Sequence, residues 1–155
     1  HYEFRTHSQF SSNRDLSAGE APAMVIFEDG YCDSCDLMHD TLLRDETANA
    51  LMAQMTVVRL NANATSPITK PDGEQTTPKA WIKELGLAVR PAIVMVDGPV
   101  ELVRIAGVLR RYHFQTALRY VAKGKYHNYP TLRDFSRAQR AQLLAAGHVI
   151  DLGAQ

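Results

Sequence analysis

Cys32 and Cys35 are the only cysteines in this 155-residue sequence, and two residues separate them. At this spacing the two sulfurs can form an internal disulfide, and the dithiol can exchange with a disulfide in another molecule. A small domain stapled by disulfides would need more cysteines, spread along the chain. The pair therefore predicts redox chemistry at one site rather than cross-linking.

The residues around the pair predict that it lies where a strand passes into a helix. Ala23–Phe27 is a continuous apolar run, which is typical of a strand covered on both faces. Cys35, Met38 and the two leucines that follow then recur at helical spacing. Cys32 would lie at the helix N-terminus, where free N–H groups stabilise a thiolate and lower the thiol pKa. We predict that Cys32 is the nucleophile and that Cys35 resolves the mixed disulfide.

Two other uses of the cysteine pair stay open on the sequence alone. His39 lies four residues after Cys35, on the same predicted helix face, and could form a metal-handling site with Cys32 and Cys35. Structural zinc usually takes four ligands from two such pairs, and only one pair is present, so we expect no bound metal. The other alternative is an inert structural disulfide.

The remaining sequence alternates predicted strands and helices. The expected elements are a short helix at Glu46–Met52, strands at Met55–Leu60, Ala92–Val96 and Val100–Ala106, a long loop at Asn61–Thr76, and helices around Trp81, over Phe114–Val121 and from Thr131. This order indicates an α/β fold, with a central mixed sheet of about four to five strands flanked by helices and a C-terminal helical extension. We expect a single domain over residues 1–155, with its core at about 20–124 and the extension at about 125–155.

Charge and hydropathy exclude several classes of partner. The 17 basic residues balance 17 acidic ones, so no long-range field favours nucleic acid or an anionic membrane. No apolar run approaches the length of a membrane-spanning helix. We therefore expect no nucleic-acid partner and no membrane insertion, and we favour a monomer.

From about Ala23 to Val121 the sequence resembles the thioredoxin superfamily. The resemblance rests on Val25-Ile26-Phe27, Cys32–Cys35, Arg90-Pro91 and Gly107, in that order. It implies a thioredoxin-like fold and a thiol–disulfide oxidoreductase that needs no bound cofactor.

The same resemblance implies which residues contact the substrate. Pro91 would be a cis-proline facing the cysteines, and the residue before it, Arg90, would contact the substrate. With Tyr31, which stands where general thioredoxins have Trp, these two residues form the expected substrate-binding set. We expect the Arg90 guanidinium to favour the Cys32 thiolate and the Asp33 carboxylate to oppose it.

The expected proton acceptor differs from that of general thioredoxins, which carry a buried Asp on the first strand. The matching position here is Ile26, and Glu28 at the end of the same strand is the nearest candidate acceptor. A solvated strand terminus is the alternative role for Glu28.

Within the superfamily the sequence is similar to exported bacterial thioredoxin-like proteins of the SoxW type. The similarity lies in Phe27-Glu28, in Met38-His39 after Cys35, in His113-Phe114, in Leu118–Val121 and in Gly124–Pro130. It implies a periplasmic location and a reductant that acts on protein disulfides and is recharged by an upstream dithiol donor. A non-catalytic adaptor that docks through Tyr126–Pro130 and the C-terminal helix is a further alternative.

Overall fold

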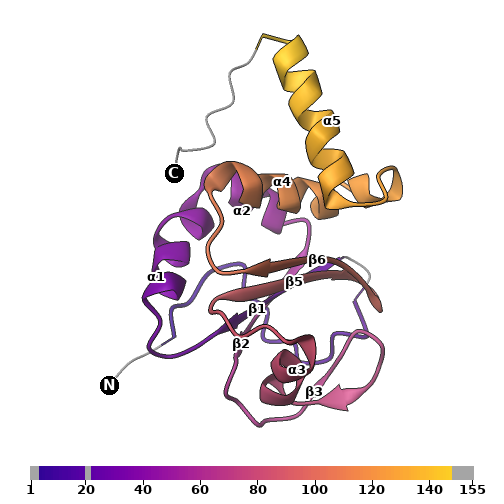
Figure 1. Ribbon diagram of the computed structural model, residues 1–155. Helices are drawn as coiled ribbons and strands as arrows, with labels where there is room; N and C mark the ends of the chain where they lie inside the picture. Colours follow the sequence, from indigo (N-terminus) through magenta and orange to yellow (C-terminus); the bar gives the residue numbers. More distant parts are fainter. Residues whose placement is uncertain (1–3, 20–21, 148–155) are drawn as a thin grey trace.

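A four-stranded sheet forms the centre of the computed structural model, which describes residues 4–19 and 22–147. Its strands are β1 (Ala23–Glu28), β2 (Thr56–Asn61), β5 (Ala92–Asp97) and β6 (Val100–Ala106). Their order is β2-β1-β5-β6, with β1 and β2 parallel and the other two pairings antiparallel (Figure 1). The predicted mixed sheet is confirmed, with four strands.

Helices cover both faces of this sheet, as the strand–helix alternation predicted. The helices of the described residues are α1 (Asp33–Asp40), α2 (Glu46–Met52), α3 (Pro78–Leu85), α4 (Arg111–Ala122) and α5 (Leu132–Ala145), with single 3-10 turns at η1 (Leu42–Arg44) and η2 (Lys125–His127). Figure 1 shows α1, α2 and α4 on one side of the sheet and α3 on the other. The flanking helices therefore create two hydrophobic cores.

Alternation along β1 divides its side chains between these two cores. Met24 and Ile26 belong to the core beneath α1, α2 and α4, whereas Val25 and Phe27 belong to the core with Trp81 of α3. Because side chains of a strand alternate between faces, the next residue on the α1 side is Glu28. The fold thus directs a carboxylate toward the helix that carries the cysteines.

The predicted loop at Asn61–Thr76 contains a small hairpin that the sequence did not indicate. It pairs β3 (Ile68–Thr69) with β4 (Gln75–Thr76), and Gly73 in the turn adopts a positive φ of 87°. Two-residue strands show no alternation, so no period could reveal them.

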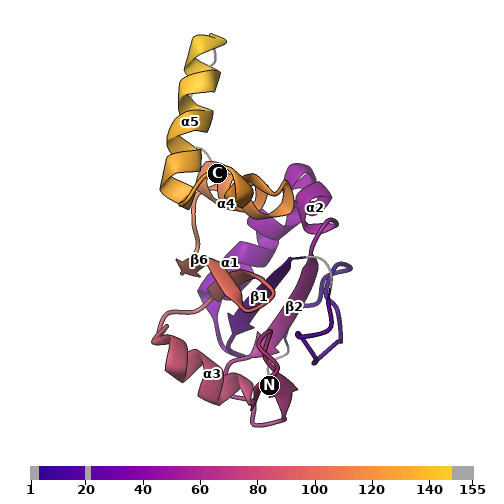
Figure 2. The same cartoon turned by 90° about the vertical axis from the view of Figure 1, so that its right-hand side faces the viewer.

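The N-terminal segment, residues 4–19, runs along the outer edge of β2 (Figure 2). Phe10 makes a parallel bridge to Val57, and Asp15 makes one to Thr69. This segment covers a strand edge that would otherwise expose unpaired N–H and C=O groups. It also brings its side chains close to α1.

The C-terminal helices extend the molecule beyond α4. Phe135 of α5 is buried in the core on the α4 side, and the Tyr120 hydroxyl donates to the Tyr129 carbonyl at 2.8 Å. Figures 1 and 2 show the rest of α5 projecting away from the sheet. The expected extension is described as far as Gly147, and its last eight positions lie outside the described residues. None of the helices in the described part of the chain is long and apolar enough to cross a membrane.

Candidate active site

Cys32 and Cys35 form a disulfide at the start of α1. Cys32 is the N-cap residue, with extended backbone angles, and its Sγ accepts a hydrogen bond from the Cys35 N–H at 3.0 Å. Cys35 is buried one turn into the helix, whereas Cys32 is partly exposed. The predicted position of the pair at a strand-to-helix junction is therefore confirmed.

The helix start favours a thiolate on Cys32. A sulfur at the N-cap faces the free N–H groups of the first turn, which stabilise negative charge. The exposed carboxylates of Asp33 and Asp36 lie in the same turn and work against it. Arg5 lies 3.7 Å from Asp36 and offsets part of this charge.

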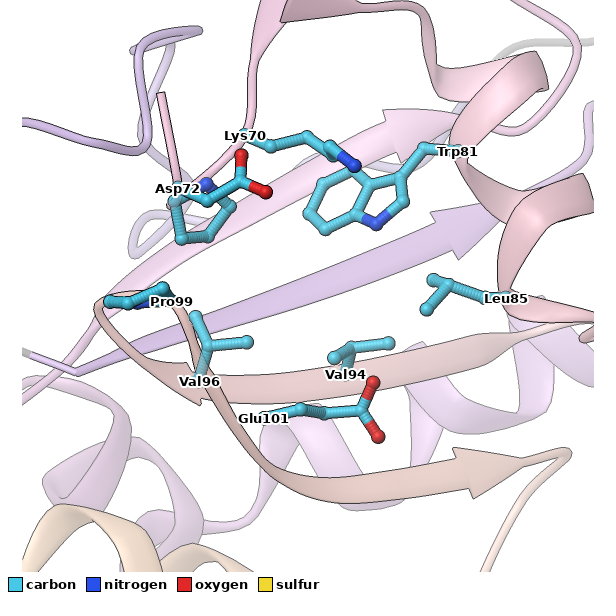
Figure 3. Close-up of a pocket in the computed structure, with 9 residues that line it drawn as sticks. Lys70, Asp72, Trp81, Leu85, Val94, Val96, Pro99 and Glu101 are labelled. Atoms are coloured by element: carbon cyan, nitrogen blue, oxygen red, sulfur yellow. The ribbon is translucent and has the colours of Figure 1, made fainter. Parts of the chain in front are cut away.

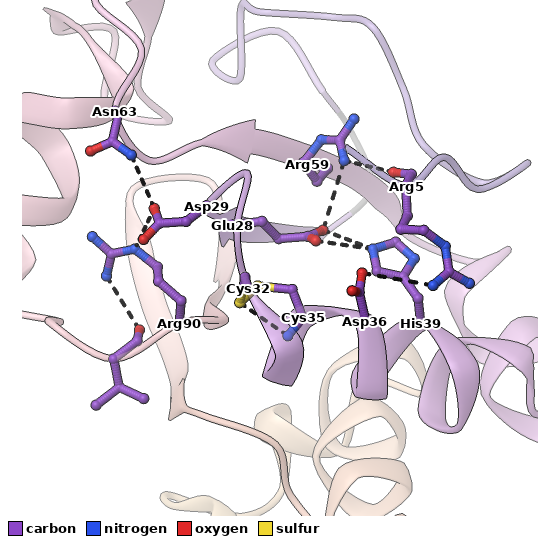
Figure 4. The surroundings of a disulfide bond; sticks show 11 residues. Arg5, Glu28, Asp29, Cys32, Cys35, Asp36, His39, Arg59, Asn63 and Arg90 are labelled. Atoms are coloured by element: carbon purple, nitrogen blue, oxygen red, sulfur yellow. Dashed lines mark hydrogen bonds and ion pairs between the residues drawn. A yellow bond between two sulfur atoms is a disulfide. The ribbon is translucent and has the colours of Figure 1, made fainter. Parts of the chain in front are cut away.

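Glu28 and His39 form a buried pair on one side of the disulfide (Figure 4). His39 Nε2 lies 2.9 Å and 3.1 Å from the two Glu28 carboxylate oxygens. The two side chains are only 2% and 3% exposed. The solvated role considered for Glu28 is therefore wrong, because the side chain points inward from the end of β1.

Arg59 of β2 and the N-terminal segment close this buried pair. Arg59 Nη1 lies 3.9 Å from Glu28 Oε2 and donates to the Arg5 carbonyl at 2.6 Å. Its guanidinium lies over the rings of Phe4 and Phe10, at 4.9 and 5.4 Å from their centroids. Burial lowers the pKa of Arg59, although the Glu28 charge acts in the opposite direction. The Phe10 ring also stands edge-on to His39, with 5.8 Å between centroids.

The other side of the disulfide is more open and carries Asp29, Asn63 and Arg90 (Figure 4). Arg90 Nε and Asn63 Nδ2 donate to Asp29 Oδ1 at 3.3 and 3.2 Å, and Arg90 Nη1 donates to the Leu87 carbonyl at 2.9 Å. The guanidinium is thus engaged by Asp29 and by backbone oxygen. The charge that we expected to act on Cys32 has a competing carboxylate.

The other expected substrate contacts lie around this open side. The Arg90–Pro91 peptide bond is cis, and the Pro91 carbonyl accepts from the Gly107 N–H at 2.8 Å. Tyr31 precedes Cys32 and is 74% exposed.

A hollow of about 390 Å³ adjoins Arg90. Its other lining residues come from the end of β2, from α3 and from the segment that follows α3: Ala62, Asn63, Lys79, Ile82, Lys83, Gly86, Leu87 and Ala88. A second hollow, of about 140 Å³, lies between α3 and the β5–β6 hairpin, with Trp81 and Val94 in its lining (Figure 3). The second hollow shares no residue with the cysteine site.

The metal-handling alternative would need His39 beside Cys32 and Cys35. His39 binds Glu28 instead of completing a set with Cys32 and Cys35. Among residues 4–19 and 22–147, no group of three or more His, Cys, Asp or Glu side chains is placed to hold a metal ion. His39 lies against the Glu28 carboxylate in this structure, which gives the three-ligand alternative no support.

Sequence reasoning missed the partners of Glu28 and Asp29. Two signals could have found the buried pair. Glu28 continues the inward-facing series of Met24 and Ile26, and His39 lies one helical turn beyond Cys35. No local signal predicts the approach of Arg59 or Arg90, because these contacts join distant parts of the chain.

Comparison with known proteins agrees with the observed fold. A family model described as a thioredoxin-like domain matches residues 12–122. A solved thioredoxin-fold protein from Helicobacter pylori is 15% identical, with a TM-score of 0.70 over 85% of this chain and 88% of the other. The oxidised C-terminal domain of Neisseria meningitidis DsbD is 18% identical, with a TM-score of 0.51 over 65% and 80%. No curated protein matches the sequence. At these identities the solved structures show the thioredoxin-like α/β fold alone.

Proposed function

Because the chain belongs to the thioredoxin-like domain family, we propose that it is a thiol–disulfide oxidoreductase that reduces protein disulfides. The observation that carries this proposal is the Cys32–Cys35 disulfide at the N-terminus of α1, with Cys32 partly exposed and Cys35 buried. This difference in exposure suits a dithiol in which the exposed sulfur attacks the substrate and the buried sulfur then resolves the mixed disulfide.

The exchange proceeds in two displacements at sulfur. The Cys32 thiolate attacks one sulfur of the substrate disulfide, and the other substrate sulfur leaves as a thiolate. Cys35 then loses its proton and attacks Cys32 Sγ, so that the Cys32–Cys35 bond forms and the second substrate thiolate departs. Two electrons pass to the substrate, and both departing thiolates take up protons. An upstream dithiol donor must then reduce the internal disulfide again.

We assign supporting roles to the residues around the disulfide. Glu28 is the proposed proton acceptor for Cys35, which is supported by its burial on the α1 side of β1. Tyr31, Arg90 and Pro91 are the proposed substrate contacts. The exposure of Tyr31 and the hollow beside Arg90 support these contacts.

The cellular setting is a further part of the proposal. The SoxW-type similarity in the sequence supports a periplasmic reductant. We also propose one monomeric domain over residues 1–155, with a core at about 20–124 and an extension at about 125–155. The burial of Phe135 in the core beside α4 supports treating α5 as part of that domain.

The test is catalysed reduction of insulin disulfides with dithiothreitol as the donor. We expect turnover by the native protein and none by Cys32→Ser, which lacks the nucleophile. Cys35→Ser should instead accumulate a mixed disulfide through Cys32. Native protein without turnover would contradict the assignment and would favour a non-catalytic adaptor. Cys32→Ser at the native rate would contradict the assignment of Cys32 as the nucleophile.

A further inference from the structure

The buried pair of Glu28 and His39 needs an explanation beyond the exchange of sulfur bonds. Burying a carboxylate is costly unless it is paired and hydrogen-bonded. An apolar residue at either position would continue the core that Met24, Ile26 and Met38 already form. The chain instead keeps two polar groups at the end of β1, next to the helix that carries Cys35.

The helix geometry brings His39 close to Cys35. Residues four apart on a helix are neighbours on one face, and side chains lean toward the helix N-terminus. Cys35, Met38 and His39 are the buried residues of α1, so they share the face that packs on the sheet. The face of α1 that buries Cys35 therefore also buries His39, and Figure 4 shows the Glu28 carboxylate on the disulfide side of the His39 ring.

We propose that His39 is a positioning residue for the Cys35 proton acceptor: a Glu28 carboxylate oxygen takes the proton from Cys35 Sγ, and the His39 Nε2–H holds that carboxylate in place. This inference rests on the proposed function, since it concerns the second displacement. It goes beyond a lone carboxylate acceptor, because the two groups are coupled and neither serves without the other.

The hydrogen-bond chemistry supports this division of roles between Glu28 and His39. A carboxylate can only accept, so the ring hydrogen lies on His39 Nε2 and both Glu28 oxygens face it. With a neutral imidazole, the pair carries one negative charge, and the Cys35 proton neutralises it as the thiolate forms. The negative charge moves from the pair to the sulfur, and the buried region gains no net charge. This avoids the cost of creating a new charge away from water.

The groups around the pair shield it from water and include charges of both signs. The charged side chains around it are Arg59 from β2, Arg5 from the N-terminal segment, and Asp36 and Asp40 from α1. His7 packs against Phe10, whose ring contacts His39. Arg5 contacts both aspartates, and His7 Nε2 is held 2.9 Å from the Leu43 carbonyl. Arg59 is therefore the cation nearest to the Glu28 carboxylate in the described part of the chain.

The experiment separates the two displacements in one reaction of the reduced protein with 5,5′-dithiobis(2-nitrobenzoate). Attack by Cys32 releases the first thionitrobenzoate in a bimolecular phase, and attack by Cys35 releases the second in a unimolecular phase. We expect Glu28→Gln and His39→Gln each to slow the second phase by about 100-fold, the lower end for a lost general base. The first phase should change by less than about twofold, because Cys32 attacks without the pair.

The double variant tests whether the two residues form a unit. Glu28→Gln with His39→Gln should be no slower than either single variant, because groups that act together show strongly non-additive effects. Glu46→Gln, at an exposed position in the first turn of α2, is the control for loss of a carboxylate, and His113→Gln is the control for loss of an imidazole. Both controls should keep the native second phase.

Several outcomes would overturn the proposal while leaving the proposed function intact. These are a native second phase in His39→Gln, or a double variant whose slowing is the product of the two single effects. A native protein without the first phase would instead contradict the proposed function.

A measurement on the native protein keeps the test independent of how the variants fold. The ring signals of His39 in NMR spectra should move when the disulfide is reduced, while those of His113 should not. Unchanged His39 signals would overturn the inference.

Discussion

The two sides of the disulfide treat neighbouring carboxylates in opposite ways. Glu28 is 2% exposed and lies against His39, whereas the Asp29 side chain is 35% exposed and accepts from Arg90 and Asn63. One step along the extended backbone turns the side chain from the interior to the surface. Two neighbouring carboxylates therefore differ in burial and in partners, and this difference follows from the alternation of side chains along the strand.

This contrast has energetic consequences for the two sides. Removing one partner of a buried charged pair leaves the other partner unpaired away from water, at a cost of about 3–5 kcal/mol. An exposed ion pair contributes about 0–1 kcal/mol, because water and salt screen it. Substitutions on the buried side should therefore lower the free energy of unfolding much more than substitutions on the open side.

The largest expected effect comes from breaking the buried side. Glu28→Ala leaves His39 and Arg59 without their shared carboxylate, and we expect the free energy of unfolding to fall by about 3–5 kcal/mol. Urea denaturation followed by circular dichroism measures this loss.

A double substitution controls for the loss of side-chain volume in that prediction. Glu28→Leu with His39→Leu replaces the pair by apolar groups and should be more stable than either single leucine variant. A Glu28→Ala protein within 1 kcal/mol of the native one would show that the pair makes no such contribution.

On the open side we expect a much smaller loss of stability. Asp29→Ala removes the carboxylate, but Arg90 keeps its bond to the Leu87 carbonyl and both groups can be hydrated. The free energy of unfolding should fall by no more than about 1 kcal/mol. The same urea titration checks this, and a loss above about 2 kcal/mol would remove the contrast between the sides.

A further prediction concerns the effect of Arg90 on the reactivity of Cys32. Because its guanidinium already contacts Asp29, Arg90→Ala should change the rate of Cys32 alkylation by iodoacetamide by less than about threefold. Asp29→Ala tests the same idea in reverse, since it releases the guanidinium and should speed alkylation. A tenfold slowing in Arg90→Ala would mean that Arg90 acts on the Cys32 thiolate directly.

The smallest expected effect is a loss of stability of the N-terminal segment at low pH. The hydrogen bond from Arg5 lowers the pKa of Asp40 below its ordinary value of 3.8. A carboxyl with a lowered pKa stabilises the fold above its unfolded pKa, and this contribution disappears as the pH falls through the folded pKa. Hydrogen exchange of residues 4–10 should therefore quicken slightly at a pH below 3.8. In Arg5→Ala that added acid sensitivity should be absent.

The sequence predicted the sheet, the helix start and the cysteine pair because each has a short-range signature. Apolar runs, a change of period and a two-residue spacing are all visible within a few positions. The sequence placed His39 on the same helix face as Cys35, but it did not indicate that Glu28 lies opposite this face. Only the contact between β1 and α1 shows that two polar residues can share an apolar interface.

Contacts between distant segments could not be predicted from the chain alone. Arg59 meets the Arg5 carbonyl across 54 positions, and Arg90 meets Asp29 across 61. Nothing in either arginine's neighbours indicates these partners, because long side chains on a strand or loop have many reachable acceptors. Single-sequence patterns thus placed the sulfurs but not the charges that surround them.

The N-terminal segment also has a consequence for where the working unit begins. The family match starts at Ser12, yet Arg5, His7 and Phe10 supply the contacts that cover α1 and the buried pair. A truncated chain that began at Ser12 would keep the region that matches the family model but would lose the contacts that shield Glu28 and His39 from water. The region that matches the family model and the region needed to keep the pair buried therefore begin at different residues.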